Sequence, residues 1–340
     1  MLAGIYKGSR QIELEDYKLR KLKTNELLIE VGSCGICGTD FHIVDGTAPS
    51  KQPVILGHEY SGKIVETNNQ INGFHVDDQV VIDPNIHCGI CEFCKIGKVN
   101  HCTNLRALGV SENGGLAQYS IVPASQLYHV PNDFSLQTAA FAEPLSCCIH
   151  GIKQSSLKLG DKVAIVGAGT IGLLMLQLAR LQGSSTVVII EPSPEKRKIA
   201  KGLGADQVVD SDDADIIQEI IGLSGGGFDV VLECVGNVIA AESSLKIVKR
   251  GGTVLLFGLP DFSASITLKL QSFFQKEISL KSSLLNPFTF QTAVDLLVSG
   301  KISVEQFNPV QVSFRNEELV TLFNNSKNNS VVKYMVAPNN

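Results

Sequence analysis

A glycine-rich turn near the middle of the chain limits the possible folds most strongly. Residues 167–172 read Gly-Ala-Gly-Thr-Ile-Gly, directly after the apolar segment 162–166 and directly before an apolar helical segment. In dinucleotide-binding folds, the first glycine of a GxGxxG turn allows a tight turn, the second lets the backbone approach a pyrophosphate, and the third allows close helix–strand packing. The free amides at the helix start suit phosphate oxygens. The residues expected at such a site are Gly167, Gly169, Thr170, Ile171 and Gly172.

The next predicted strand, 186–190, ends at Glu191, which lies 22 residues after Gly169. A carboxylate at this position accepts hydrogen bonds from the adenosine ribose and repels a 2′-phosphate. The sequence therefore predicts NAD rather than NADP as the dinucleotide. Lys196 and Arg197 follow about one helical turn later. Arg197 is a further candidate for contacting the cofactor, and the two cations leave some tolerance of NADP open.

Hydrophobic patterning divides the 340 residues into two regions, so we expect an α/β protein of two domains. Residues 146–282 alternate apolar strands with helices, which predicts a doubly wound parallel sheet of the Rossmann type. Residues 1–145 consist of short β runs separated by turns, which predicts a bent antiparallel β domain. Residues 283–340 are too few to fold alone, so we expect them to return to the β domain.

Four of the nine cysteines are closely spaced, in the pattern C-x2-C-x2-C-x7-C. Four thiolates on short loops complete a tetrahedral zinc site and leave no position for a substrate, so the predicted zinc is structural. We expect a zinc lobe at about 84–106. A zinc ribbon that binds nucleic acid is the alternative, and the acidic net charge of −5 argues against it. The predicted structural ligands are Cys88, Cys91, Cys94 and Cys102.

A second group of ligand-type residues lies between these features and the N-terminus. Cys37 occurs in the segment 35–42, Gly-Ile-Cys-Gly-Thr-Asp-Phe-His, and His58 is followed by Glu59. A mixed set of sulfur, nitrogen and oxygen donors suits a zinc ion that keeps one open position. Taken one at a time, a core thiol and a loop histidine are the simpler interpretations, so the prediction depends on the combination.

Together these motifs resemble the zinc-containing medium-chain dehydrogenases, over essentially the whole chain. The matching segments are 35–42, 57–59, the four-cysteine lobe, Glu143-Pro144-Leu145 and the GxGxxG turn, in the family's order. The resemblance implies a GroES-like β catalytic domain (1–145 and 283–340) with an inserted Rossmann domain (146–282). It also implies two zinc ions per chain, with Cys37 and His58 as catalytic zinc ligands.

The resemblance also implies a reaction, the transfer of a hydride from a secondary hydroxyl to NAD at zinc, which gives a ketose-type product. Thr39 would take the hydroxyl proton and His42 would pass it on as a general base. The resemblance further implies that carboxylates at both Glu59 and Glu143 serve the catalytic zinc, Glu59 directly and Glu143 directly or through water, and which of the two is the direct ligand stays open. Cys147 and Cys148 are interpreted as core thiols.

Glu143 occupies the position at which ordinary alcohol dehydrogenases of the family have cysteine, and this resembles the polyol and threonine branch. Sorbitol dehydrogenases of that branch have a tyrosine and an arginine where this chain has Ile43 and Leu285, which argues against sorbitol itself. A different polyol, a polyol phosphate, a vicinal diol or threonine remain open. So do a butanediol or secondary alcohol dehydrogenase and, more distantly, a binding protein without turnover. Candidate phosphate-binding cations are Arg106, Lys281 and Arg315.

Charge and composition exclude several classes of partner. The net charge of −5 gives no basis for binding nucleic acid or an anionic membrane. The N-terminus lacks the pattern of a signal peptide, and the apolar segment 173–181 is too short to span a bilayer. We therefore expect a cytoplasmic protein with no membrane partner. Family resemblance implies a homodimer or homotetramer.

Overall fold

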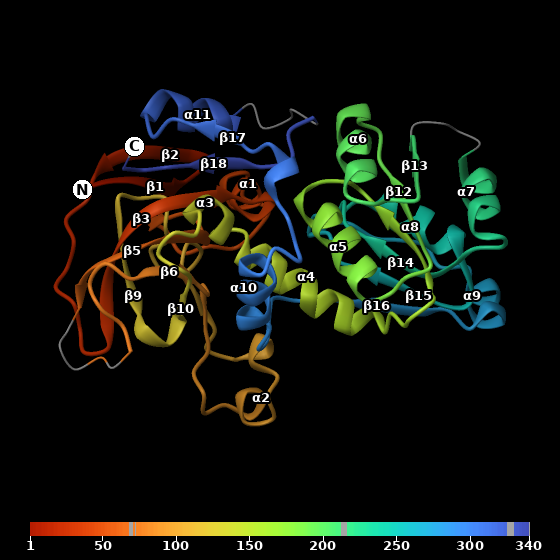
Figure 1. Ribbon diagram of the computed structural model, residues 1–340, viewed down its shortest axis with the longest axis horizontal. Coiled ribbons are helices and arrows are strands. Elements are labelled where there is room, and N and C mark those ends of the chain that lie inside the picture. The colour runs from red at the N-terminus through yellow and green to blue at the C-terminus, as the bar shows by residue number, and fades with distance from the viewer. Residues whose placement is uncertain (68–70, 72, 212–215, 325–329, 340) are drawn as a thin grey trace. The chain divides into compact units, whose positions relative to one another are not determined.

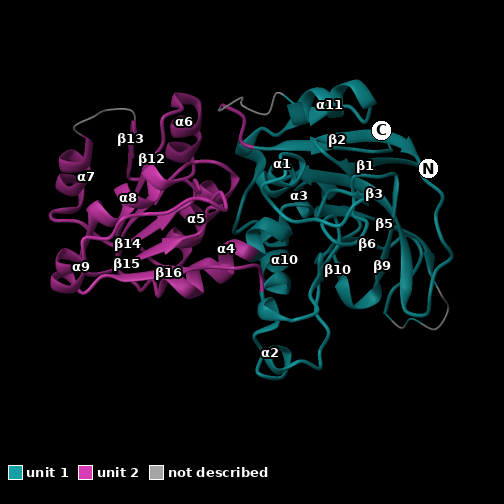
Figure 2. Ribbon diagram, turned by 180° about the vertical axis from the view of Figure 1, so that it is seen from behind, with its two compact units in different colours: residues 1–146, 287–328, 333–340 teal, residues 147–286, 329–332 magenta. Residues whose placement is uncertain are grey.

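The computed structural model describes residues 1–67, 71, 73–211, 216–324 and 330–339 (Figure 1). The chain divides into two compact units (Figure 2). Unit 1 comprises residues 1–146, 287–328 and 333–340, and unit 2 comprises residues 147–286 and 329–332. The sequence placed the boundaries after 145 and 282. It did not anticipate that the short segment 329–332 belongs to the second unit.

Unit 1 is built mainly on antiparallel strands, as the short β runs predicted, with one parallel pair between β17 and β18. Among the described residues, its main sheet has seven strands, in the order β10-β6-β5-β3-β18-β17 with β9 paired to β3. Their bounds are β3 Glu26–Ile36, β5 Glu59–Thr67, β6 Gln79–Ile82, β9 Tyr119–Pro123, β10 Leu127–His129, β17 Val310–Val312 and β18 Tyr334–Val336. The smaller sheets comprise β1 Leu2–Gly8, β2 Gln11–Asp16 and β4 Val54–Ile55, and β7 Asn85–Ile86 with β8 Arg106–Ala107.

The helices of unit 1 are short. They are α1 Gly38–Val44, α2 Glu92–Lys95, α3 Leu136–Ala139, α10 Phe290–Val298 and α11 Asn316–Asn324, with 3-10 turns at Val99–His101, Ala124–Gln126 and Glu305–Phe307. Helix α4, Ala142–Ser155, crosses the boundary between the units. The segment 84–106 that carries α2 projects from the rest of unit 1 (Figures 1 and 2).

The register of the main sheet brings distant parts of the chain together at one end of β3. Strand β5 pairs antiparallel with β3 so that Gly35 faces Glu59, and β18 pairs with β3 so that Tyr334 faces Ile36. Leu27 and Ile29 of β3 are fully buried, so this strand is anchored in the hydrophobic core. The residues just beyond these pairs, at the end of β3 and the starts of β5 and β18, therefore lie close together.

Unit 2 is a six-stranded parallel sheet in the order β13-β12-β11-β14-β15-β16. This order is that of the doubly wound Rossmann fold, so the predicted fold class is confirmed. The strands are β11 Lys162–Val166, β12 Thr186–Ile190, β13 Gln207–Val209, β14 Phe228–Glu233, β15 Val248–Leu256 and β16 Ser279–Ser282. The helices are α5 Thr170–Leu181, α6 Pro194–Gly202, α7 Ile216–Ser224, α8 Val238–Ile247 and α9 Leu270–Lys276.

In the part of the chain that the structure describes, no helix combines the length and the apolar character needed to cross a membrane.

Candidate functional site

Three of the predicted catalytic zinc ligands converge in unit 1. Cys37 follows β3 directly, and His58 and Glu59 stand where β5 begins, so the strand register places them together. One ligand atom from each lies within 4.8 Å of the others. His58 is 7% exposed and Glu59 is 1% exposed, whereas Cys37 is half-buried. A half-buried thiol with a buried imidazole and a buried carboxylate beside it fits a zinc ion with three protein ligands and one open position.

Asp40, a residue that the sequence analysis did not assign, supports two of these ligands. It is fully buried on the first turn of α1, and its Oδ2 accepts a 2.8 Å hydrogen bond from the Cys37 amide. Its Oδ1 lies 3.4 Å from Nδ1 of His58. Burial lowers the pKa of His58, but the charges of Asp40 and Cys37 outweigh it and hold the pKa well above its ordinary value. The site therefore favours positive charge between its anions, as a metal ion requires.

Lys333, just before β18, is a second charged residue that the sequence did not reveal. Its Nζ forms an ion pair with Oε2 of Glu59, and it is 5% exposed. Burial opposes the charge of Lys333, but Glu59 and Cys37 raise its pKa above the ordinary value. A Cβ on Gly35 would come within 2.6 Å of Glu59 Oε2 and 2.8 Å of Lys333 Cε, so a larger residue at this strand position would displace the ends of both side chains.

Glu143 is not a member of the group of three converging ligands. It is buried, at 6% exposure, in the first turn of α4. Among the described residues, the group whose ligand atoms lie within 4.8 Å of one another contains Glu59 and not Glu143. Of the two carboxylates considered from the sequence, the structure thus brings Glu59 to Cys37 and His58.

The two predicted proton-relay residues both lie on α1. Oγ1 of Thr39 is 3.7 Å from the Cys37 thiol, so its hydroxyl borders the ligand cluster. His42 lies one turn further along, half-buried, with its Nδ1 2.9 Å from Oγ1 of Thr47. Of the two cysteines interpreted as core thiols, Cys148 is fully buried, with its thiol 3.9 Å from the carbonyl oxygen of Ile171, whereas Cys147 is only half-buried.

The four cysteines of the lobe also converge, each with one sulfur within 4.8 Å of the others. Backbone amides point at these sulfurs: the Cys91 amide donates to Cys88 at 3.4 Å and the Cys88 amide donates to Cys102 at 3.3 Å. Backbone amides lower the pKa of Cys91 to about 6, whereas burial and the neighbouring sulfurs raise that of Cys94 to about 12. Four adjacent thiolates coexist only with a cation, and an all-sulfur set of four suits a closed zinc site.

The glycine-rich turn of unit 2 has the three-part geometry expected of a dinucleotide site. Gly167 has φ +97°, a conformation that favours glycine, and a Cβ on Gly172 would lie 1.9 Å from the Gly167 carbonyl oxygen. A Cβ on Gly169, by contrast, would meet no described atom within 4 Å. The first and third glycines are therefore required by the fold itself, whereas the space at the second is free for a ligand. Thr170 begins α5, and its hydroxyl donates to the Val332 carbonyl at 2.7 Å.

Glu191 and Arg197 lie beside this turn but are already engaged. Oε2 of the buried Glu191 accepts a 2.6 Å hydrogen bond from the Ala168 amide within the turn, so the carboxylate is held against it. Arg197 donates to the Glu191 carbonyl at 2.7 Å and forms a 3.0 Å ion pair with Asp210. The Arg197 guanidinium is thus already paired with an acidic residue, and its contact with a cofactor stays a prediction.

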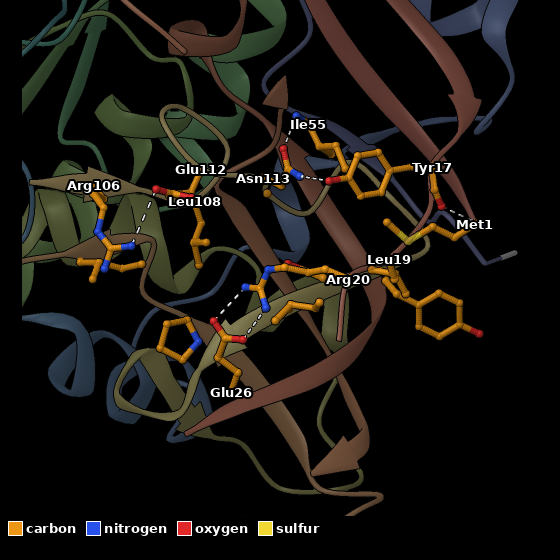
Figure 3. Close-up of a pocket in the computed structure, with 16 residues that line it drawn as sticks. Met1, Tyr17, Leu19, Arg20, Glu26, Ile55, Arg106, Leu108, Glu112 and Asn113 are labelled. Atoms are coloured by element: carbon orange, nitrogen blue, oxygen red, sulfur yellow. Dashed lines mark hydrogen bonds and ion pairs between the residues drawn. The ribbon is translucent and has the colours of Figure 1, made fainter. Parts of the chain in front are cut away.

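Unit 1 also contains a cavity of about 100 Å³ beside the N-terminal residues, to which none of the predicted zinc, proton-relay or dinucleotide residues contributes (Figure 3). Its polar groups pair with one another: Arg20 Nη2 lies 2.8 Å from Glu26 Oε1, and Asn113 donates to the Tyr17 hydroxyl at 2.9 Å. Arg106, a candidate phosphate ligand, lies 3.7 Å from Glu112 in its wall. Charges that are balanced in this way give no basis for assigning a ligand.

Comparisons with known proteins agree with this geometry. Residues 23–132 match the alcohol dehydrogenase GroES-like domain, and residues 170–299 match the zinc-binding dehydrogenase domain. D-arabinitol dehydrogenase 1 of Uromyces fabae is 34% identical over 100% of this chain and 97% of its own length. Sorbitol dehydrogenase of Halalkalibacterium halodurans is 33% identical, with 92% of each chain covered.

Among solved structures, a putative zinc-binding dehydrogenase of Sinorhizobium meliloti bound to NADP superposes with a TM-score of 0.95. It is 36% identical, and 99% of each chain is covered. The resemblance noted in the sequence is thereby confirmed. The chain belongs to the zinc-binding dehydrogenases with an alcohol dehydrogenase GroES-like domain, in the branch that contains the polyol and threonine dehydrogenases.

Proposed function

We propose that this protein oxidises a secondary hydroxyl of a polyol to a ketose-type carbonyl and reduces NAD, with zinc held by Cys37, His58 and Glu59. The observation that carries this proposal is the buried convergence of these three ligands within 4.8 Å of one another. Two polyol dehydrogenases share 34% and 33% sequence identity with this chain, which supports a polyol as the substrate class.

Bound zinc would hold the substrate oxygen and lower the pKa of its hydroxyl, and bound NAD would accept the hydride. The chain's own residues supply the proton path. Thr39 borders the ligand cluster, 3.7 Å from the Cys37 thiol, and is positioned to accept the hydroxyl proton. His42, on the same helix, acts as the general base that takes the proton onward. Asp40 orients His58, and Lys333 holds Glu59.

For the dinucleotide, two contacts support NAD. The Glu191 carboxylate is held against the glycine-rich turn by the Ala168 amide, where it would repel a 2′-phosphate. Arg197, the cation that would have favoured NADP, is paired with Asp210. The S. meliloti relative was solved with NADP, so the preference for NAD is a point on which this chain is expected to differ from it.

Within the polyols, sorbitol itself is disfavoured. Ile43 is 1% exposed and packs in the hydrophobic core of unit 1, so it offers no hydroxyl-binding group next to His42. A homo-oligomer is supported by large apolar side chains exposed on unit 2: Phe262, Leu270 and Phe274 are 75%, 76% and 82% exposed. Burial of such side chains against a second copy is favourable.

The test is a screen of dinucleotide reduction, with NAD and NADP separately, over pentitols, hexitols, their phosphates, butanediol and threonine. The proposal predicts the highest kcat/KM with NAD and a pentitol or hexitol. Cys37→Ser should abolish that activity, while Cys147→Ser, a cysteine outside both clusters, should retain it. Highest activity on butanediol or threonine would refute the polyol assignment, and activity with NADP alone would refute the assignment of Glu191.

A further inference from the structure

We propose that Thr47 is a positioning residue that fixes the tautomer of His42, keeping the ring proton on Nδ1 so that Nε2 stays a proton acceptor. This inference rests on the proposed function of His42 as general base. Thr47 is not part of any motif that the sequence analysis used, and its role follows from how helix α1 ends.

Helix α1 ends in a Schellman motif that brings Thr47 back over His42. Gly46 has φ +77°, the left-handed conformation that such an ending requires. The Gly46 amide donates to the Ile43 carbonyl at 3.0 Å, and the Thr47 amide donates to the His42 carbonyl at 2.8 Å. In this motif the residues at the two ends of the longer hydrogen bond commonly make an apolar side-chain contact. Here the contact is polar, between Oγ1 of Thr47 and Nδ1 of His42.

The donor geometry of the Thr47 hydroxyl towards the His42 carbonyl gives this contact a direction. The Thr47 hydroxyl has one proton, and its Oγ1 lies 3.2 Å from the His42 carbonyl oxygen with donor geometry. That carbonyl also accepts from the amides of Thr47 and Ala48. When the hydroxyl proton points to the carbonyl, Oγ1 meets Nδ1 at 2.9 Å as an acceptor, so Nδ1 carries the ring proton. The reverse arrangement would put the ring proton on Nε2.

The consequence concerns the other ring nitrogen. Among the described residues, Nε2 of His42 has no hydrogen-bond partner, and Thr47 already occupies Nδ1. Only Nε2 is left to exchange protons, and a neutral histidine accepts a proton only at the nitrogen that lacks one. A threonine that holds the Nδ1 proton therefore presents His42 in the form that a general base needs.

The tautomer can be read directly, without turnover. Protein labelled with 15N-histidine gives long-range 15N–1H spectra that distinguish protonated from unprotonated ring nitrogens, and His42→Gln identifies the His42 signals by their loss. We expect Nδ1 protonated in the wild type and in Thr47→Ser. Thr47→Val, which keeps the shape but lacks the hydroxyl, should shift the population towards Nε2–H. A wild type protonated on Nε2, or an unchanged pattern in Thr47→Val, would overturn the proposal.

Kinetics separate a positioning role from a purely structural one. General-base catalysis contributes about 10²- to 10⁴-fold, so Thr47→Val should lower kcat by on the order of tenfold with KM little changed, and Thr47→Ser should restore most of it. In a His42→Gln background, Thr47→Val should cause no further loss. An equal loss in both backgrounds would contradict action through His42. Full turnover in His42→Gln would instead refute the base assignment, and the spectra would still decide the tautomer.

Discussion

The four-cysteine cluster and the Cys37–His58–Glu59 cluster are held in place by different means. The lobe cysteines come from one stretch of 15 residues, Cys88 to Cys102, and helix α2 among them buries none of its side chains. Backbone amides directed at sulfur are among the contacts that organise the lobe. The other cluster stands at the ends of paired strands in the core of unit 1, braced by the buried charges of Asp40 and Lys333.

This difference indicates whether the local conformation depends on the bound metal at each site. Four thiolates occupy all four coordination positions of a tetrahedral zinc ion. We therefore expect the conformation of the lobe to depend on its metal. The three-ligand cluster is positioned by paired strands of the sheet, and three protein ligands leave one coordination position for a substrate oxygen. Loss of the first metal should therefore be seen in stability, and loss of the second in turnover.

The largest effect is expected from Cys37→Ser. Removal of a metal that polarises the substrate costs several kcal/mol of transition-state stabilisation, so kcat/KM should fall by about 10³-fold or more. Steady-state kinetics and metal analysis would measure it, with zinc content falling from two to one per chain. Because the sheet holds this cluster, the melting temperature should change little. A large drop in melting temperature would contradict the claim that the sheet, and not the zinc, holds this cluster in place.

Cys94→Ser makes the reciprocal change in the lobe. We expect loss of the lobe zinc and faster proteolysis within 84–106. The melting temperature should fall by roughly 2–4 °C for each kcal/mol of stability lost. The kcat per remaining folded molecule should stay within a few-fold of wild type. Differential scanning calorimetry and limited proteolysis test this; turnover lost in parallel with Cys37→Ser would show that the lobe takes part in catalysis.

Asp40→Asn sharpens the comparison by removing a charge next to a ligand without removing the ligand. Asparagine can still accept the Cys37 amide hydrogen, but it no longer offers a carboxylate to Nδ1 of His58. Loss of such a partner typically costs about 10- to 100-fold in metal affinity or activity. Competition with a zinc chelator would measure the affinity. The lobe zinc should be unaffected, and equal weakening of both zincs would contradict the assignment.

The smallest effect is expected from Gly35→Ala. The new Cβ would press on Glu59 Oε2 and Lys333 Cε, and overpacking of this kind costs about 1–3 kcal/mol. We expect activity to fall by about tenfold or less, with both zincs retained. Gly89→Ala is the matched lobe variant, because Gly89 has φ +74° but open space around its Cβ. It should affect melting and not turnover; the reverse pattern would argue against the roles given to the two clusters.

Short-range patterns in the sequence were enough to predict the Rossmann sheet, the glycine-rich turn and the four-cysteine lobe. The pairing of Cys37 with His58 and Glu59 was inferred from residue type and family resemblance, and the β3–β5 register gives its physical basis. Lys333 could not have been predicted, because it reaches Glu59 only through the pairing of β18 with β3 across almost the whole chain.

Other contacts could not be predicted from the sequence, for different reasons. Asp40 stands within a motif that was recognised, but its double role depends on the direction of its carboxylate, which a motif does not specify. Glu191 was expected to face a ribose, and its bond to the Ala168 amide emerges only from the packing of β12 beside the turn. The contact between Thr47 and His42 depends on a single left-handed glycine, Gly46.

Stepwise zinc removal tests the central claim most directly. A chelator is titrated into the wild-type enzyme while zinc content, NAD-linked polyol oxidation and melting temperature are followed in the same samples. We predict two zincs per chain: loss of one abolishes turnover at a nearly unchanged melting temperature, and loss of the other lowers the melting temperature. A single zinc per chain, or turnover and melting temperature that fall together with the same zinc, would contradict the account.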